Sequence, residues 1–125
     1  MRIGNHKSSF EMNGIVFECV LQPRSNDKLP RYNFVALRNR EEIARGQLFI
    51  KNEEVRGLVD IRSVRKGHGF GADVVKALKC KTPDMLIYDV KEHAREFWEK
   101  MGFDLVLENG LLMGVATPQK PMAIA

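Results

Sequence analysis

The residues best suited to chemistry in this chain lie at 58–72, which read Leu-Val-Asp-Ile-Arg-Ser-Val-Arg-Lys-Gly-His-Gly-Phe-Gly-Ala. Three alternating glycines allow a tight turn in which backbone N–H groups approach a ligand closely. A helix that follows such a loop adds unsatisfied N–H groups and the positive end of its dipole, and both favour a phosphate. Arg65 and Lys66 add fixed positive charge. The stretch therefore predicts a phosphate or pyrophosphate site at residues 67–72.

The first sixty residues, which must support that loop, have the pattern of antiparallel strands. Asn13-Gly14 stands between two apolar runs and is the strongest short signal for a hairpin. A polar, proline-bounded segment predicts a loop at 23–32, and polar residues predict turns at 39–42 and near 52–53. The predicted strands are 8–12, 15–20, 33–38, 43–51 and 55–64.

Helical spacing begins only after the glycines. Apolar residues at i, i+4, i+7 and i+8 predict a helix from Phe70 that ends before Pro83, and similar spacing predicts a second helix at 94–101. Between them, 85–90 is short and mostly apolar, as expected of a strand buried on both faces. A closing hairpin is predicted at 105–107 and 111–115.

This order of elements predicts an α+β fold. A mostly antiparallel sheet would carry two main helices, and the helix between strands 55–64 and 85–90 would make one parallel β-α-β crossover. With 125 residues the chain has enough material for a single core. We expect one domain at 1–116, followed by a loose C-terminal tail at 117–125.

Two phosphate ligands compete for the glycine loop. Residues 67–72 fit the dinucleotide pattern G-x-G-x-x-A, and Asp89 after the next strand would be the ribose-binding carboxylate of an NAD(P)-binding, Rossmann-like enzyme. That fold needs repeated βα units, however, and only one crossover is predicted here. The dinucleotide interpretation is therefore the weakest of those we consider.

The second interpretation uses more of the chain. Lys66-Gly67-His68-Gly69-Phe70-Gly71 resembles motif A of the GNAT superfamily of N-acetyltransferases, with Lys66 at the place of the family's Gln or Arg. Residues 94–103, AREFWEKMGF, resemble the family signature A-x-x-F-Y-x-K-x-G-F. The two motifs occur in the family's order and spacing, and the resemblance covers about residues 33–116. The sequence differs from the family in its N-terminal part, where only the loop 23–32 stands in place of the family's usual one or two helices.

What the resemblance implies is a site for acetyl-CoA as acetyl donor. Backbone groups around Ile61 and Ser63 would pair with the pantetheine arm, and an N–H near Ile61 would polarise the thioester carbonyl. Trp98 would border the pantetheine. The pyrophosphate would be held by Arg65, Lys66, Gly67, His68, Gly69, Phe70, Gly71 and Ala72.

The implied reaction is direct attack of an amine on the thioester, which needs a base for the ammonium proton and is helped by an acid at the leaving thiolate. Many family members use the tyrosine of the F-Y pair as that acid, but Trp98 stands here and has no acidic proton to give. Tyr88 is the substitute we name. Asp60 and Glu54, on the strand that often supplies a base, are the candidate bases.

The missing acid and front helices leave an alternative open. A catalytically degenerate member would bind CoA or only a protein partner. If the chain is active, the acceptor is an amine, of a small molecule or a protein, and a second copy of the chain would be one way to complete the acceptor side. The sequence does not identify the acceptor.

Composition and charge argue against several classes of ligand and location. The net charge is +4, and a phosphate-rich cofactor explains the basic residues around the glycines, whereas a single aromatic and no recognised motif argue against nucleic acid. No apolar run is long enough to span a membrane, and two cysteines without metal-ligand spacing predict reduced thiols, no metal and a cytoplasmic protein. The basic residues are Arg62, Arg65, Lys66, Lys76, Lys79 and Lys81.

Overall fold

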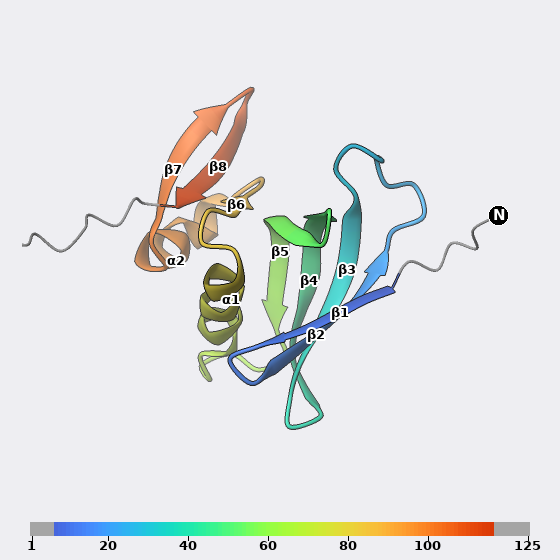
Figure 1. Ribbon diagram of the computed structural model, residues 1–125. Coiled ribbons are helices and arrows are strands. Elements are labelled where there is room, and N and C mark those ends of the chain that lie inside the picture. Colours follow the sequence, from blue (N-terminus) through green and yellow to red (C-terminus); the bar gives the residue numbers. More distant parts are fainter. Residues whose placement is uncertain (1–6, 117–125) are drawn as a thin grey trace, which may run out of the picture.

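A computed structural model describes residues 7–116, which form one eight-stranded sheet and two α-helices (Figure 1). The strand order is β1-β2-β3-β4-β5-β6-β8-β7, and every neighbouring pair is antiparallel except β5 and β6. The elements are β1 Lys7–Met12, β2 Ile15–Leu21, β3 Arg31–Arg38, β4 Glu41–Lys51, β5 Glu54–Ser63, α1 Phe70–Lys81, β6 Leu86–Ile87, a 3-10 turn η1 Glu92–Ala94, α2 Arg95–Lys100, β7 Phe103–Glu108 and β8 Leu111–Ala116.

This architecture confirms the predicted α+β class, with its mostly antiparallel sheet and single parallel crossover. Residues 22–30 between β2 and β3 contain no helix, as the short polar segment predicts. The predicted tail at 117–125 lies outside the described residues.

Tight turns join the strands of the meander. The turns at Asn13-Gly14, Asn39-Arg40, Asn52-Glu53 and Asn109-Gly110 each have positive φ at both central residues. Turns of this kind twist in the same sense as the strands that they join, which is why asparagine and glycine are favoured in them. These turns also set the register of the sheet, and the register places the side chains of the site.

The strand predicted at 85–90 is wrong in length, because only Leu86 and Ile87 are in strand conformation. Met85, Ile87 and Val90 are buried, so the segment is apolar for the reason expected. The Tyr88 and Val90 N–H groups still donate to the Leu58 and Leu112 carbonyl oxygens, but Asp89 between them adopts a left-handed conformation with φ 54° and interrupts the strand. Burial alone therefore does not make this segment a strand.

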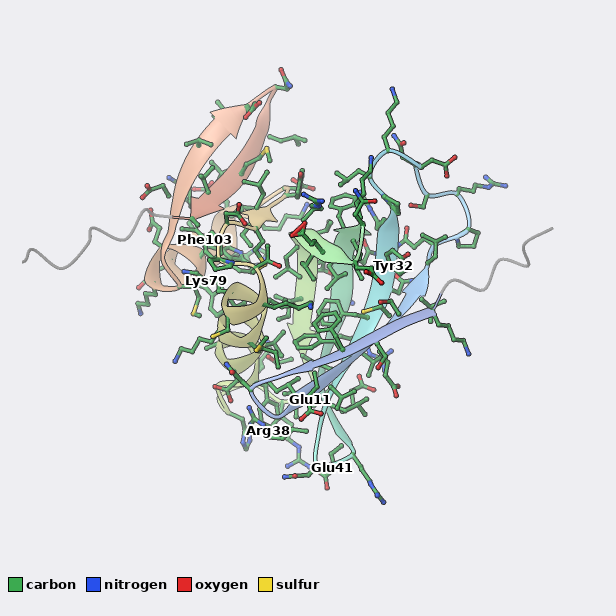
Figure 2. All side chains as sticks on the ribbon, viewed as in Figure 1. Glu11, Tyr32, Arg38, Glu41, Lys79 and Phe103 are labelled. Atoms are coloured by element: carbon green, nitrogen blue, oxygen red, sulfur yellow. The ribbon has the colours of Figure 1, made fainter. Side chains whose placement is uncertain are left out.

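The core lies between the sheet and α1, which covers one of its faces (Figure 1). Val74, Val75, Ala77 and Leu78 of α1 are fully buried against apolar residues of the strands. The last turn of α1 also contacts the C-terminal hairpin, where Lys79 lies 4.8 Å from the ring centroid of Phe103 (Figure 2).

Candidate functional site

A cleft of about 510 Å³ opens where β5 and β6 separate. The two parallel strands pair only at Gly57–Leu86 and Leu58–Ile87, after which β5 continues in the sheet and the other segment turns away. The cleft is lined by residues 59–61 and 63 of β5, 87–91, 93, 94, 97 and 98, together with Arg31, Gln47 and Gly71.

A β-bulge lies at the point of separation. Gln47 pairs with Asp60 and Leu48 with Leu58, so Val59 is an extra residue on β5. A bulge increases the local twist of its strand, which turns β5 away from a straight path beside β6. The carbonyl oxygen of Asp60 lies where residue 46 would carry a Cβ, so glycine at 46 makes this bulge possible.

Adjacent residues of β5 line the cleft from opposite faces of the sheet. Asp60 is opposite Gln47 in the register, and the next residue, Ile61, is opposite Gly46. Neighbouring side chains of a strand point to opposite faces. The cleft therefore passes through the sheet, from the face covered by α1 to the face that carries Asp60.

Ser63 and Gly71 line one end of the cleft, and we call the stretch from 63 to 72 the glycine end. Gly67 and Gly69 have φ of 80° and 72°, which L side chains rarely adopt, and no atom lies within 4 Å of a Cβ built at either. At Gly71 a Cβ would lie 3.3 Å from Ser63 Oγ, a tight contact that a small shift of the Ser63 side chain would relieve. Backbone conformation thus accounts for glycine at 67 and 69, whereas a close neighbour is the feature at 71.

The helix amides face the same end. The first i to i−4 bond of α1 runs from the Asp73 N–H to the Gly69 carbonyl oxygen, at 3.0 Å. The N–H groups of Phe70, Gly71 and Ala72 precede that bond and have no acceptor within the helix. Arg38 pairs with the Asp73 carboxylate at 2.9 Å and so offsets the one acidic group in the first turn.

Two of the six basic residues grouped with the loop lie elsewhere. Lys79 donates to the Met101 carbonyl oxygen at 2.8 Å, and Lys81 lies over the Phe10 ring at 4.8 Å, both in the last turn of α1. A phosphate cofactor therefore does not explain these two lysines, because they lie at the opposite end of the helix. Arg65, Lys66 and His68 are exposed in the loop itself, with the His68 ring 5.5 Å from that of Phe70.

Phe97 and Trp98, two aromatic residues of α2, form one wall of the cleft. Trp98 is 5% exposed and packs edge-on against Phe97 and Phe103, with centroids 4.9 and 5.8 Å apart. Both Phe97 and Trp98 line the cleft. Trp98 is thus part of the core as well as of the wall.

At the other end, which we call the arginine end (Arg31, Gln47, Phe49, Asp60 and Tyr88), side chains from several strands meet. Arg31 Nη1 lies 3.4 Å from Gln47 Oε1, and its guanidinium carbon lies 5.1 Å from the Phe49 ring centroid. The rings of Phe49 and Tyr88 are 4.9 Å apart at 73°. These contacts form an aromatic wall beside a cation.

A glycine makes this wall possible too. Gly57 is opposite both Phe49 and Leu86 in the register. The Tyr88 ring occupies the space of a Cβ on Gly57, so it can lie down on the sheet. Burial raises the pKa of the Tyr88 phenol above its ordinary value, and the group stays protonated at neutral pH.

The two candidate bases, Asp60 and Glu54, lie in different places relative to the cleft. Asp60 lines the cleft, with Arg62 Nε 3.6 Å from its carboxylate. Glu54 does not line it, because it stands at the opposite end of β5, pairs with Arg56 at 3.2 Å and borders a separate hollow. The structure brings Asp60 and Tyr88 together and leaves Glu54 outside.

Arg31, Gln47 and Phe49 are site residues that sequence reasoning missed. Their positions carry no motif, and an arginine or glutamine in a strand is usually solvated. Only the pairing of β3 with β4 and of β4 with β5 brings them to the same part of the sheet as Asp60, with Gln47 directly opposite it. No spacing rule within one segment would have found them.

His93 also lines the cleft, whereas the two cysteines do not. Cys19 and Cys80 are free, and burial raises the pKa of the Cys19 thiol to about 12. Residues 7–116 hold no cluster of three or more His, Cys, Asp or Glu fit for a metal ion. Within the same range, no helix is both long and apolar enough to cross a bilayer.

Comparison with models of known protein families and with curated protein sequences finds no match. Among solved structures, the crystal structure of Escherichia coli ElaA is similar, with a TM-score of 0.39 and 18% sequence identity. The match covers 70% of this chain and 68% of that one. A likeness of this size says nothing about activity, which has to be argued from the cleft.

Proposed function

We propose that this chain is an N-acetyltransferase of GNAT type, which transfers an acetyl group from acetyl-CoA to an amine by direct attack. One observation carries the proposal: the separation of β5 from β6, with main-chain amides at one end of the cleft and a carboxylate and a phenol at the other. A long thioester donor needs such a passage, since its phosphates and its reactive carbon lie far apart.

The residues at the glycine end fit the pyrophosphate of that donor. The amides of Phe70, Gly71 and Ala72 lack acceptors within the helix, and anions bind well at such helix starts. Gly67 and Gly69 keep the loop free of side chains where a ligand would approach. Arg65 and Lys66 are exposed beside them and supply positive charge.

Backbone groups of β5 fit the pantetheine arm. Past Leu58, the edge of β5 that faces β6 has no strand partner within residues 7–116, so its N–H and C=O groups can pair with an extended ligand as a further strand would. Ile61 and Ser63 line this part of the cleft. An N–H near Ile61 is the donor we assign to the thioester oxygen.

When bound, acetyl-CoA supplies an acetyl thioester that an uncharged amine can attack. Asp60 is the group we assign to take the ammonium proton, directly or through a water. The Tyr88 phenol stays protonated and can donate a hydrogen bond near the leaving sulfur, although its raised pKa makes it a weak acid. Trp98 and Phe97 keep the passage apolar and exclude water.

One observation favours a second candidate, a protein that binds CoA without transferring acetyl. Trp98 takes the place of the usual acid and is 5% exposed in a packed aromatic group. A CoA thiol with a pKa near 8.5 can still leave as thiolate near neutral pH, so losing the acid slows the reaction without abolishing it. We therefore place transfer ahead of binding alone.

Thermal melting with acetyl-CoA, CoA, NAD or no ligand tests the proposal. A ligand at 100 times its Kd adds about 2.7 kcal/mol to the free energy of unfolding, and we expect that gain with both CoA species. No shift with either would overturn the cofactor assignment, and a shift with NAD alone would restore the dinucleotide interpretation. A shift without CoA release across a panel of amines and peptides would favour the second candidate.

A matched pair of variants locates the ligand. Gly69→Asp places a negative charge at the expected pyrophosphate and should remove the acetyl-CoA shift. Gly110→Asp introduces the same residue at a similar positive φ, also with no atom within 4 Å of its Cβ, but on the β7–β8 hairpin. The second variant should keep the shift; equal shifts in both would contradict the placement.

A further inference from the structure

We infer that the acceptor is a short amino acid, an amine with a carboxylate a few bonds from its nitrogen, and that Arg31 binds this carboxylate. The inference rests on the proposed function and names the substrate class of the same cleft. It comes from three features of the arginine end: an arginine without a carboxylate partner, the contacts that hold it, and the register that places Asp60 opposite Gln47.

Arg31 differs from the other arginines of the sheet in lacking an acidic partner. Seven ion pairs form within residues 7–116, and none of them includes Arg31. Its side chain is half-buried in the cleft, where Gln47 accepts one hydrogen bond at 3.4 Å. A guanidinium has five N–H donors in a planar fork that matches a carboxylate. A ligand carboxylate would satisfy donors that the protein leaves to water.

The protein also holds Arg31 in place. Its backbone N–H donates to Ser25 Oγ at 2.5 Å, and its carbonyl oxygen accepts from the Gln22 N–H at 2.9 Å. The guanidinium lies over Phe49, whose ring packs edge-to-face with that of Tyr88. A cation held this way loses little freedom when an anion binds, so more of the contact energy appears as affinity.

The position of Asp60 sets the size of the ligand. The Arg31 side chain reaches from β3 to Gln47 on β4, and Gln47 is opposite Asp60 on β5. Adjacent strands lie about 4.8 Å apart, so Arg31, through its contact with Gln47, lies beside the strand that carries Asp60. A short amino acid, whose opposite charges are a few bonds apart, suits two oppositely charged groups on neighbouring strands. Its ammonium would face Asp60, and its carboxylate would face Arg31.

A carboxylate fits better than a phosphate. Lys91 on the opposite rim already pairs with Asp89 at 2.9 Å, which leaves Arg31 as the unpaired cation among the described residues that line the cleft. One guanidinium balances one negative charge, whereas a phosphate dianion would bring a second charge toward Asp60. The open face of the sheet beside Arg31 gives a small zwitterion direct access.

Acceptor kinetics test the inference. We would measure kcat/KM for CoA release with glycine, β-alanine and γ-aminobutyrate, each against its primary amide and the alkylamine of equal length, per uncharged amine. The carboxylates should be better by about 10- to 100-fold, the range expected for hydrogen bonds to a charged group. Arg31→Met should remove this preference through KM, and Arg31→Lys should keep part of it.

Arg45→Met is the matched control. Arg45 lies two residues before Gln47 on the same face of β4, pairs with Glu42 at 2.6 Å and is not part of the cleft lining. This variant should keep the wild-type preference for carboxylates. If Arg45→Met loses the preference as fully as Arg31→Met does, the effect is general charge attraction and the inference is wrong.

The acetyl-CoA melting shift, measured on the same samples, separates this inference from the proposed function. If the shift is present but amides and alkylamines react as well as the amino acids, the inference falls and the proposed function stands. If acetyl-CoA gives no shift, the proposed function falls; NMR titration with β-alanine alone then tests Arg31, with perturbations expected near Gln47 that disappear in Arg31→Met. Their absence in the wild type would overturn the inference as well.

Discussion

The two ends of the cleft are built in different ways. The glycine end is one continuous stretch, residues 63–72, in which three glycines and the first turn of α1 present main-chain groups rather than long side chains. The arginine end gathers side chains from β3, β4, β5 and the segment after β6, which are brought together by strand pairing. A local site can be recognised from its own sequence, whereas a site made by pairing exists only once the sheet has formed.

Glycines show the same difference on a smaller scale. At the glycine end, Gly67 and Gly69 are required by backbone conformation, with open space around them. At the arginine end, Gly46 and Gly57 are required by space, because the Asp60 carbonyl and the Tyr88 ring occupy the room of a side chain. Substitutions of these glycines should therefore destabilise the protein through backbone strain at the glycine end and through steric overlap at the arginine end.

The largest effect on stability is expected at Gly46. Gly46→Val forces a side chain into the Asp60 carbonyl and the Phe34 ring, and it should lower the free energy of unfolding by about 3 kcal/mol, the upper part of the usual range for overpacking. Urea denaturation measures the change. Gly14→Val, with open space and φ of 77°, should lose only about 1–2 kcal/mol to backbone strain. Equal losses of stability in the two variants would contradict our assignment of steric space as the reason for glycine at 46.

Removing the carboxylate at the arginine end should separate the two ends functionally. Asp60→Asn should lower kcat/KM for amine acetylation about 10²-fold, the low end of the range for a lost general base. The acetyl-CoA melting shift should persist, because the phosphate site that we propose lies at the glycine end. Glu54→Gln, outside the cleft, should change kcat/KM little. A larger loss in Glu54→Gln than in Asp60→Asn would reverse the assignment of the base.

The smallest effect is expected at Gly67, where only φ is at issue. Gly67→Ala should cost about 1 kcal/mol of stability, since an L residue is disfavoured in the left-handed region. Gly67→Asn should cost less, because asparagine visits that region more readily than other residues with side chains. Both can be measured by urea denaturation without ligand. An alanine variant as stable as the asparagine variant would show that backbone conformation is not the constraint.

Much of the fold could be predicted from local patterns. Asn13-Gly14 and Asn109-Gly110 marked hairpins, and the spacing of Phe70, Val74 and Leu78 marked α1, because these signals act within a few residues. The strand predicted over 85–90 failed because its apolar residues are buried by packing while the left-handed conformation of Asp89 interrupts the strand. Apolar character reports burial, and pairing needs a neighbour at the right distance.

The sequence by itself determined the glycine end, since Gly67, Gly69 and Gly71 precede a helix whose amides are oriented by its own hydrogen bonds. Only the tertiary structure decided the arginine end and the unequal positions of Asp60 and Glu54. The bulge at Val59 shifts the register of β5 by one residue, and that shift puts Asp60 opposite Gln47 and within the cleft. Register is a property of paired strands, and the spacing of residues within one strand does not contain it.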